Sequence, residues 1–356
     1  MDSVAIRLGE LTTLRLGGPA AELVTASSED ELIGAVAERD EAGAPVLVLG
    51  GGSNLVISDD GFAGRVVRIA TTGERVVDRD PDGSEVRIEV AAGEDWDAFV
   101  ARVVAAGYGG LECLSGIPGQ VGATPIQNVG AYGWEISEFL RWVRLYDRRS
   151  GRTLTVAPDD LGLTYRSSRL KGTDDAIVLS VCFGLHPDGA SQPIRYQELA
   201  RALGVAIGTR LPCAEVRAAV LELRRSKGMV LDPADHDTWS AGSFFTNPVV
   251  SAQQLRELRE RIDAVVGPEA SVPQYPAESG VKLSAAWLIE RAGFAKGHAG
   301  PGGRVSLSGK HTLALTNRGA ASTEDLLALA REVRDGVDER FGVTLRPEPL
   351  LVNCSL

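Results

Sequence analysis

Two glycine-rich segments contain the residue types that most directly indicate a binding site. In the first, the apolar run at residues 46–49 is followed by Gly50-Gly51-Gly52-Ser53-Asn54 and then by Leu55. The second extends from residue 111 to 133, with glycines at 116, 119, 122, 130 and 133. Closely spaced glycines let backbone N–H groups approach a ligand, and successive N–H groups form anion-binding nests. We therefore predict that the two segments together line a site for a large flat or phosphorylated ligand.

The second segment has no helical or strand periodicity and a single charged residue, Glu112. A long irregular segment in a compact domain is either functional or disordered, and disorder requires a polar, charged composition. The remaining alternative is a buried glycine-rich crossover without a ligand. Common nucleotide motifs are absent, because Leu55 stands where G-x-G-x-x-G needs its third glycine and Lys310 is followed by His311 rather than serine or threonine.

Length and composition restrict the class of protein. A chain of 356 residues is long enough for two domains, and its formal net charge of −11 argues against a nucleic-acid binder. No apolar run approaches the roughly 20 residues of a membrane span, and the N-terminus lacks the pattern of a signal peptide, so we expect a cytoplasmic protein. The four cysteines and four histidines show no metal-ligand spacing. We predict structural thiols and no transition metal.

Several elements that must position the glycine segments can be predicted from local patterns. Alternation over residues 11–16 predicts a strand, and the capping-box pattern at Ser28 predicts a helix to about residue 40, so that the chain begins with a β–α–β unit. Residues 64–90 have the pattern of antiparallel strands. Apolar residues from Trp96 to Val104 recur at helical spacing, and strands are expected near 141–148, 152–156 and 176–183.

The composition becomes typical of a linker around residues 208–212, where we place a domain boundary. Beyond it, helices are predicted from Pro212 onward and near 251–265, 284–292 and 322–340, and a strand pattern covers 343–352. Cations in the last turn of the first of these helices either complement the helix dipole or bind an anion.

Six stretches taken together resemble the UDP-N-acetylenolpyruvoylglucosamine reductases of bacterial peptidoglycan synthesis. They are LTTLRLGG, VLGGGSNLVISDDGF, LSGIPGQVGATPIQNVGAYG, TYRSS, GSFFTNPVV and LRPEP, spread over nearly the whole chain. The resemblance implies an α+β protein with a two-lobed FAD-binding region of the vanillyl-alcohol-oxidase (PCMH) type at 1–210, with lobes at about 1–70 and 71–210. An α/β substrate-binding domain at 211–342 and a tail at 343–356 that returns to the active site would follow. Tyr196 and the SFF sequence are similar to the type I branch.

The implied reaction reduces UDP-N-acetylglucosamine enolpyruvate, an enolpyruvyl ether, to the lactyl ether UDP-N-acetylmuramate. NADPH would reduce FAD, leave, and be replaced by the sugar nucleotide, which then accepts the hydride from flavin N5. Negative charge that develops next to the substrate carboxylate needs preorganised donors. The resemblance assigns this role to Arg166, whose guanidinium binds a carboxylate in a planar fork, together with Glu348. The alternative for Arg166 is a surface salt bridge.

The match also identifies Ser243 as the donor of the proton that completes the reduction. A serine hydroxyl is a weak acid, so the resulting alkoxide must be stabilised or quickly reprotonated. The following Phe244 and Phe245 are expected to exclude water from the intermediate.

The resemblance further implies two sets of binding residues. Backbone contacts to the FAD pyrophosphate and isoalloxazine are expected from Gly50, Gly51, Gly52, Ser53, Asn54, Leu55, Gly116, Ile117, Pro118, Gly119, Gly122, Ala123, Gln127, Asn128, Gly130, Ala131 and Tyr132. Substrate contacts are expected from Tyr132 in the nucleotide cleft, from Tyr196, Lys227 and Asn247 at the diphosphate, and from Glu290 at a variable polar position.

Further expectations concern cofactor attachment and assembly. Related flavin oxidases often bind FAD covalently through a histidine in the loop where this chain has Ser53 and Asn54, so the flavin should be non-covalent. The family suggests a monovalent cation, for which no residue identifies a site, and we expect a monomer. Two rival interpretations are an oxidase on the same scaffold and a nucleotide-sugar binder that has lost its chemistry. The latter would be expected to lack at least one of Arg166, Ser243 and Glu348.

Overall fold

The computed structural model describes residues 6–277 and 280–356, and these divide into two compact units. The first unit comprises Ala20–Gly52 and Phe62–Val230, and the second comprises Ile6–Pro19, Ser53–Gly61 and Leu231–Leu356. The chain therefore passes from one unit to the other more than once. One of these changes falls within the first glycine-rich loop, where Gly52 belongs to the first unit and Ser53 to the second.

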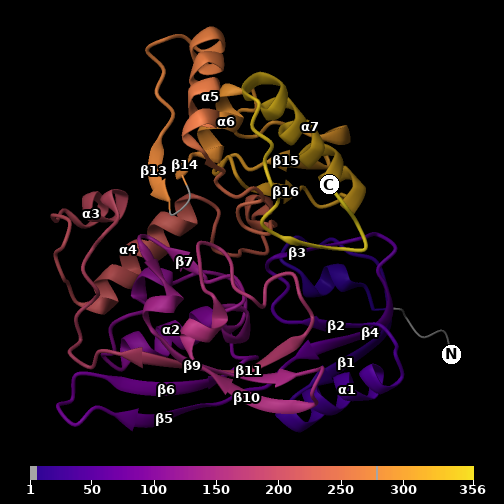
Figure 1. Ribbon diagram of the computed structural model, residues 1–356, viewed down its shortest axis with the longest axis vertical. Helices are drawn as coiled ribbons and strands as arrows, with labels where there is room; N and C mark the ends of the chain where they lie inside the picture. Colours follow the sequence, from indigo (N-terminus) through magenta and orange to yellow (C-terminus); the bar gives the residue numbers. More distant parts are fainter. Residues whose placement is uncertain (1–5, 278–279) are drawn as a thin grey trace. The chain divides into compact units, whose positions relative to one another are not determined.

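The described residues of the first unit form a three-stranded sheet, a five-stranded sheet and the small two-stranded sheet β7-β8 (Figure 1). Its helices and strands are β1 (Ala20–Ala26), α1 (Glu29–Glu41), β2 (Val46–Leu49), β4 (Phe62–Ile69), β5 (Glu74–Arg79), β6 (Val86–Ala91), α2 (Trp96–Ala105), β7 (Gly130–Ala131), β8 (Trp134–Glu135), β9 (Leu140–Asp147), β10 (Arg152–Val156), β11 (Ala176–Leu185), α3 (Gln197–Leu203) and α4 (Cys213–Ser226). The strand order β1-β4-β2 is parallel, and the order β10-β9-β11-β6-β5 is antiparallel.

The helices of the first unit follow their sequence signals. The Ser28 side chain accepts a hydrogen bond from the backbone N–H of Glu31 and so caps α1, which lies beside the three-stranded sheet (Figure 1). Helix α2 buries Trp96 and Phe99, whose ring centroids each lie 5.7 Å from that of Phe183 on β11. These aromatic residues form part of the core, as the helical spacing predicts.

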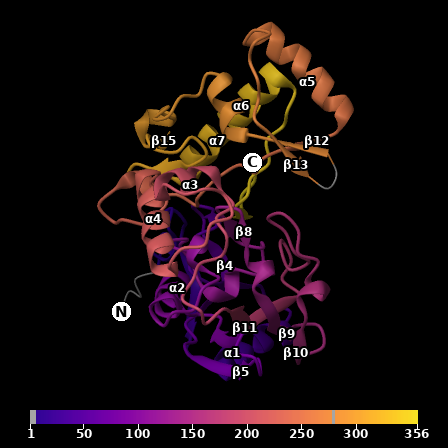
Figure 2. The ribbon, with the colours of Figure 1, turned by 90° about the vertical axis from the view of Figure 1, so that its left-hand side faces the viewer.

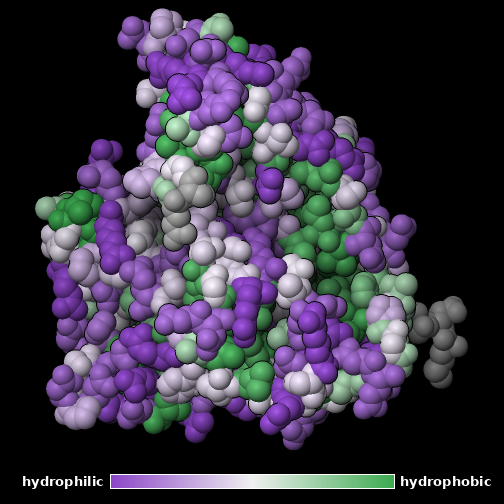
Figure 3. Space-filling view, in the orientation of Figure 1, coloured by the Kyte–Doolittle hydropathy of each residue, from purple (hydrophilic) through white to green (hydrophobic). Residues whose placement is uncertain are grey.

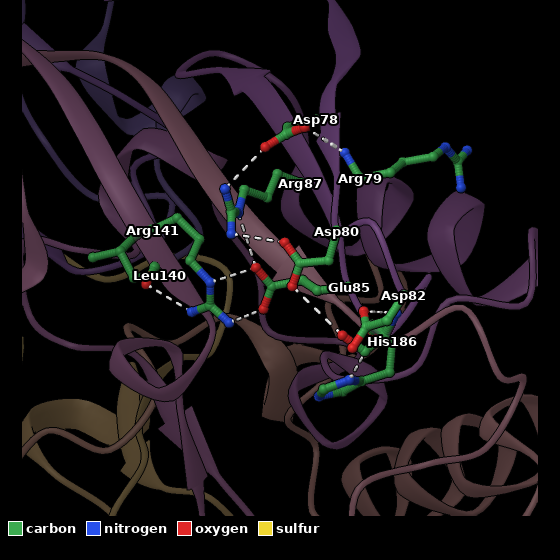
Figure 4. Close-up of polar contacts among 10 residues, drawn as sticks. Asp78, Arg79, Asp80, Asp82, Glu85, Arg87, Leu140, Arg141 and His186 are labelled. Atoms are coloured by element: carbon green, nitrogen blue, oxygen red, sulfur yellow. Dashed lines mark hydrogen bonds and ion pairs between the residues drawn. The ribbon is translucent and has the colours of Figure 1, made fainter.

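A group of ion pairs covers one end of the five-stranded sheet (Figure 4). The nearly buried Glu85 accepts hydrogen bonds from Arg141 Nε at 2.8 Å and from Arg87 Nε at 3.0 Å, and Arg87 also pairs with Asp78 and Asp80. The hydrogen bond from Arg141 and that from Arg87 hold the pKa of Glu85 below its usual value. The ion pairs thereby keep an otherwise costly carboxylate charged within the sheet.

The described residues of the second unit form three small sheets and three α-helices, besides short 3-10 helices. Its elements are β3 (Leu55–Ile57), β12 (Val249–Val250), α5 (Ala252–Val265), β13 (Gln274–Ala277), β14 (Gly280–Leu283), α6 (Ala285–Arg291), β15 (Val305–Leu307), β16 (Leu315–Asn317), α7 (Thr323–Phe341) and β17 (Leu350–Val352). The strands form the sheets β12-β14-β13, β15-β16 and β17-β3. Helix α5 lies beside β12, buries Leu258 and Ile262, and has a mostly hydrophilic outer surface (Figures 2 and 3).

Long-range contacts hold the short segment 53–61 within the second unit. Strand β3 pairs in parallel with β17 near the C-terminus, and the Asp59 carboxylate accepts hydrogen bonds from the N–H groups of Thr323 and Glu324 at the start of α7. In the described part of the chain, no helix is long and apolar enough to cross a membrane.

Two strand predictions in the N-terminal region are wrong. Residues 11–16 form no strand, because Arg15 has a φ of 54° and the Thr12 hydroxyl bonds to the carbonyl of Leu16; the first strand is β1. Residues 62–69 form β4, which is parallel to its neighbours rather than antiparallel. Its Val66 and Val67 are both fully buried, as is typical of a parallel strand covered on both faces.

Helix α4 packs Val216 and Val220 into the core of the first unit, which continues to Val230. One strand boundary differs from the sequence pattern. In the tail, only β17 forms a strand, since Pro347 and Pro349 lack the N–H groups that a ladder requires.

Candidate active site

The two glycine-rich segments touch each other in the first unit. A Cβ atom at Gly51 would lie 2.8 Å from the Cα atom of Gly119, and one at Gly50 would lie 3.1 Å from Oε1 of Gln120. The close approach therefore depends on the absence of a side chain at Gly51. This contact joins the first loop to the second segment, which the sequence predicts to act with it.

The irregular segment 111–133 is ordered by hydrogen bonds to the β6–α2 connection. The N–H of Val121 donates to the carbonyl of Glu94, the N–H of Gly122 to that of Ala92, and the Trp96 indole to that of Leu114. A Cβ atom at Gly122 would lie only 2.5 Å from the Cβ atom of Ala92. The segment is thus a fixed wall whose shape depends on its glycines.

Two polar atoms beside this wall are buried and have no hydrogen-bond partner among the described residues: Gln120 Oε1 and Arg224 Nε. Other atoms of the two side chains make hydrogen bonds that hold them in place. Gln120 Nε2 donates to the carbonyl of Ile69, and Arg224 Nη2 donates to the carbonyl of Met229, both at 3.0 Å. Arg224 Nε lies 3.4 Å from the Cβ position of Gly116, and burial lowers the pKa of its guanidinium. A buried acceptor and a buried cation at a glycine wall are suited to a polar, anionic ligand.

Arg166 is held by the C-terminal part of the wall. Its Nη2 donates to the carbonyl of Gly130 at 2.5 Å, its Nη1 lies 3.9 Å from Oε1 of Glu135, and its backbone has a strained φ of 54°. The buried Asn128 donates from Nδ2 to Oε2 of Glu135 at 2.7 Å and to the carbonyl of Thr164 at 3.1 Å. The wall therefore determines the place of this guanidinium.

Three of the predicted substrate residues lie in two neighbouring contacts of the first unit. The Tyr132 and Tyr196 rings are nearly perpendicular with centroids 5.6 Å apart, and Lys227 Nζ lies 2.5 Å from Oε2 of Glu198, two residues after Tyr196. Burial raises the pKa of Tyr132 to about 12, so its hydroxyl stays protonated at neutral pH. Tyr196 is 45% exposed and precedes α3 directly.

Backbone hydrogen bonds join three segments of the second unit at Phe244, the residue after Ser243. The N–H of Phe244 donates to the carbonyl of Leu313 at 2.7 Å, and the N–H of Glu348 donates to the carbonyl of Phe244 at 2.8 Å. Ser243 therefore lies between the segment that contains His311 and the segment that contains Glu348. The Ser243 Oγ is 3.5 Å from Nε2 of His311.

Other predicted residues of the second unit are near the same three segments. The Asn54 carbonyl accepts from the N–H of Leu350 at 3.0 Å, next to Glu348, and Phe244 and Phe245 are both 1% exposed. Asn247 Oδ1 accepts from the N–H of Ala285 at the start of α6, whereas Glu290 on the same helix accepts from the Thr312 hydroxyl. Among the residues that the structure describes, no cluster of His, Cys, Asp or Glu side chains could hold a metal ion.

Two known families match the two parts of the chain. The family described as FAD binding domain matches residues 20–157, and the family described as UDP-N-acetylenolpyruvoylglucosamine reductase, C-terminal domain, matches residues 232–352. A UDP-N-acetylenolpyruvoylglucosamine reductase of Saccharopolyspora erythraea is 64% identical over 350 residues, which are 98% of this chain and 95% of that protein. The chain belongs to the UDP-N-acetylenolpyruvoylglucosamine reductase family.

Other members of the reductase family support this assignment. The reductase of Nocardia farcinica is 59% identical and covers 99% of this chain, with 90% of its own length matched. The crystal structure of UDP-N-acetylenolpyruvylglucosamine reductase from Thermus caldophilus is 27% identical, with a TM-score of 0.63, and covers 98% of this chain and 97% of its own. The chain is therefore an FAD-dependent oxidoreductase, and the resemblance noted in its sequence is confirmed.

The residues at the glycine wall fit FAD. Gly51 packs closely against Gly119, and the unpartnered Gln120 Oε1 and Arg224 Nε offer an acceptor and a cation to a cofactor with a polar ring system and a pyrophosphate. Gln120 was not among the residues predicted from sequence. Arg224 was considered only as one of several cations in the last turn of its helix.

Two further neighbours of predicted residues could not be identified from sequence. Glu198, which pairs with Lys227, and His311, which contacts Ser243, are distant from their partners along the chain. No sequence pattern indicated a functional role for His311. Its place after Gly309-Lys310 served only as an argument against a phosphate-binding loop.

Proposed function

We propose that this protein uses NADPH to reduce UDP-N-acetylglucosamine enolpyruvate to UDP-N-acetylmuramate, a precursor of peptidoglycan, with FAD bound non-covalently. When bound, FAD takes a hydride from NADPH and supplies it to the enolpyruvyl double bond. The observation that supports this proposal most strongly is the backbone hydrogen bond from Glu348 to Phe244, the residue after Ser243, in a family named for this reductase reaction. A half-buried hydroxyl and a half-buried carboxylate on adjacent segments are suited to deliver a proton after hydride addition.

Each unit contributes groups with distinct roles in this proposal. Arg166 binds the substrate carboxylate and stabilises the negative charge that develops next to it, and its fixed position in the wall reduces reorganisation during the reaction. Ser243 donates the proton to the carbon next to the carboxylate. Glu348 faces the same substrate carboxylate. Because two negative groups cannot share a site cheaply, Glu348 must lie near a cation or carry a proton there. The buried rings of Phe244 and Phe245 exclude water.

Lys227, Tyr196 and Asn247 bind the diphosphate of the substrate in this proposal. An ammonium group, a phenol and an amide are all donors that match phosphate oxygens. Tyr132, protonated at neutral pH, donates a hydrogen bond in the nucleotide cleft, and Glu290 makes a polar contact with the sugar nucleotide. Lys227 is paired with Glu198, so when the diphosphate binds this carboxylate either competes with it for the ammonium group or orients the ammonium group toward it.

The remaining parts of the proposal concern organisation. We assign residues 1–210 to cofactor binding, 211–342 to substrate binding and 343–356 to a tail that carries the region of Glu348 into the active site. The protein acts as a monomer in the cytoplasm, where NADPH and the sugar nucleotide are available.

An anaerobic absorbance titration of the purified protein tests the proposal. NADPH should bleach the yellow flavin, and UDP-N-acetylglucosamine enolpyruvate should restore its colour with one equivalent of substrate. Bleaching without recolouring would show that the substrate is wrong, whereas absence of flavin even after addition of FAD would contradict the role of both glycine-rich segments. Reduction by NADH at the same rate as by NADPH would contradict the choice of nicotinamide.

A further inference from the structure

The side chain of His311 lies next to Ser243 in the second unit. The Nε2 atom of His311 is 3.5 Å from Oγ of Ser243, at the outer limit of a hydrogen bond, and catalytic hydrogen bonds often shorten when substrate binds. The N–H of Phe244, the residue after Ser243, donates at 2.7 Å to the carbonyl of Leu313, which is two residues after His311. The pairing of the two segments therefore sets the distance between the imidazole and the hydroxyl.

The turn between β15 and β16 holds His311 in this place. The Oγ atom of the fully buried Ser308 accepts hydrogen bonds from the N–H groups of Lys310 and His311, at 3.0 and 3.2 Å. The N–H of Ala314 donates to the carbonyl of His311 at 3.1 Å, and the N–H of Ser308 donates to the carbonyl of Ala314 at 2.8 Å. These bonds close the turn from both sides, so the imidazole is attached to a fixed backbone.

Charged groups in and next to this turn form ion pairs with the segment around His236. Lys310 Nζ lies 2.5 Å from Oδ2 of Asp235, and Arg318 Nη1 lies 2.9 Å from Oδ1 of Asp237, which also accepts from the N–H of Gly309. Thr312 donates its hydroxyl to Glu290. Each of these carboxylates therefore has a nearby donor of its own, whereas the His311 imidazole lies 3.5 Å from the Ser243 hydroxyl.

We propose that His311 is a positioning residue that returns a proton to Ser243, and this inference rests on the proposed role of Ser243 as proton donor. When Ser243 gives its hydroxyl proton to the substrate carbon, one C–H bond forms and the serine oxygen is left with a negative charge. The protonated imidazole of His311 donates an N–H to that oxygen, transfers the proton and becomes neutral. It then takes one proton from water, so that each turnover consumes the one proton that accompanies the hydride.

The chemistry of the two side chains favours this arrangement. The proton of an isolated serine is too tightly held for efficient transfer near pH 7, whereas imidazole has an ordinary pKa of about 6.5 and changes protonation readily at that pH. A positive N–H placed beside Oγ stabilises the alkoxide as it forms, which is the requirement that a serine acid imposes.

The experiment measures both half-reactions of the FAD-loaded enzyme by stopped flow for His311→Ala, Ser243→Ala and the double variant. His311→Ala should slow flavin reoxidation by the enolpyruvyl substrate by about 10- to 1,000-fold, since general acid–base groups contribute about 100- to 10,000-fold and water replaces part of this. Flavin reduction by NADPH and the dissociation constant of the substrate should stay unchanged. In the Ser243→Ala background, the second substitution should change the rate of reoxidation less than about twofold, because a residue that acts through Ser243 has no effect without it.

Controls separate this role from a structural one. His298→Ala, which removes another histidine of the same unit, should leave both half-reactions unchanged, and His311→Gln provides a second variant if His311→Ala loses FAD or folds poorly. Equal loss in both half-reactions, or multiplicative effects in the double variant, would overturn the inference. Slow reoxidation in Ser243→Ala with normal reoxidation in His311→Ala and His311→Gln would overturn it while leaving the proposed function intact. Normal reoxidation in Ser243→Ala would refute the proton-donor role and this inference together.

Discussion

The two units contribute to the candidate site by different means. In the first unit, the surface suited to the cofactor is made largely of backbone, at glycines whose missing side chains allow Gly51 and Gly119 to approach closely. In the second unit, reactive side chains stand on three adjacent segments, and Ser243 and His311 are 68 residues apart in sequence. One surface depends on the absence of side chains, and the other depends on a few particular ones.

This difference separates the consequences of substitution in the two regions. Adding atoms to the glycine wall should disturb cofactor binding through steric conflict, whatever the chemistry of the added group. Removing a few atoms from Ser243 should leave the cofactor site unchanged and affect only the chemical step. The two half-reactions of the enzyme allow these consequences to be measured separately.

The largest expected effect is that of Ser243→Ala. Flavin reduction by NADPH should continue at nearly the normal rate, whereas reoxidation by the substrate should fall by roughly 100- to 10,000-fold, the range for loss of a general acid. Stopped-flow absorbance of the flavin measures both rates. An equal loss in the two half-reactions would contradict the separation between the units as well as the role of Ser243.

Lys227→Ala tests whether a side chain of the first unit acts on the substrate alone. Hydrogen bonds to charged groups contribute about 1.5–3 kcal/mol, so the dissociation constant of the substrate should rise about 10- to 150-fold. The FAD content should not change. Titration of the oxidised flavin spectrum with substrate gives the constant, and Lys296→Ala, which removes an exposed lysine of the second unit, serves as the control. An unchanged dissociation constant would exclude Lys227 from diphosphate binding.

Gly51→Ala tests the backbone surface directly. The added Cβ atom would lie 2.8 Å from Gly119 Cα, and the backbone shifts that such overpacking forces cost about 1–3 kcal/mol. We expect the dissociation constant of FAD to rise by about 5- to 150-fold, as measured by fluorescence of released flavin. Gly34→Ala is the matched control, because its Cβ atom meets nothing within 4 Å in α1 and the change should slightly stabilise the helix. Normal FAD affinity in Gly51→Ala would show that the wall adapts to a side chain.

The same difference explains which features could be predicted from the sequence. The caps of α1 and the apolar spacing of α2 are local signals, and both helices form where expected. The glycine-rich wall was also recognisable, since glycine spacing is local too. In contrast, the pairing of Ser243–Thr246 with the segments at His311 and Glu348 arises from tertiary contacts, so His311 could not be connected with Ser243.

The errors in the fold have a similar physical origin. The alternation at residues 11–16 favours a strand, but hydrogen bonds of Thr12 and Thr13 to backbone carbonyls and the positive φ of Arg15 give the segment another conformation. The parallel arrangement of β4 depends on its placement between β1 and β2, which its own residues do not encode. The role of Glu198 was missed for the same reason, since only the fold brings it to Lys227.

Glu198→Gln should have the smallest effect and distinguishes two roles of the carboxylate. If Glu198 competes with the substrate diphosphate for Lys227, its neutral replacement should tighten substrate binding by about two- to fivefold, the range for a partly exposed ion pair worth up to about 1 kcal/mol. The gain should shrink at high ionic strength, because salt screens such pairs. Glu222→Gln, an exposed change on α4, controls for the altered net charge. Weaker binding in Glu198→Gln alone would instead mean that the carboxylate orients Lys227 toward the substrate. The first unit would then depend on paired side chains, as the second unit does.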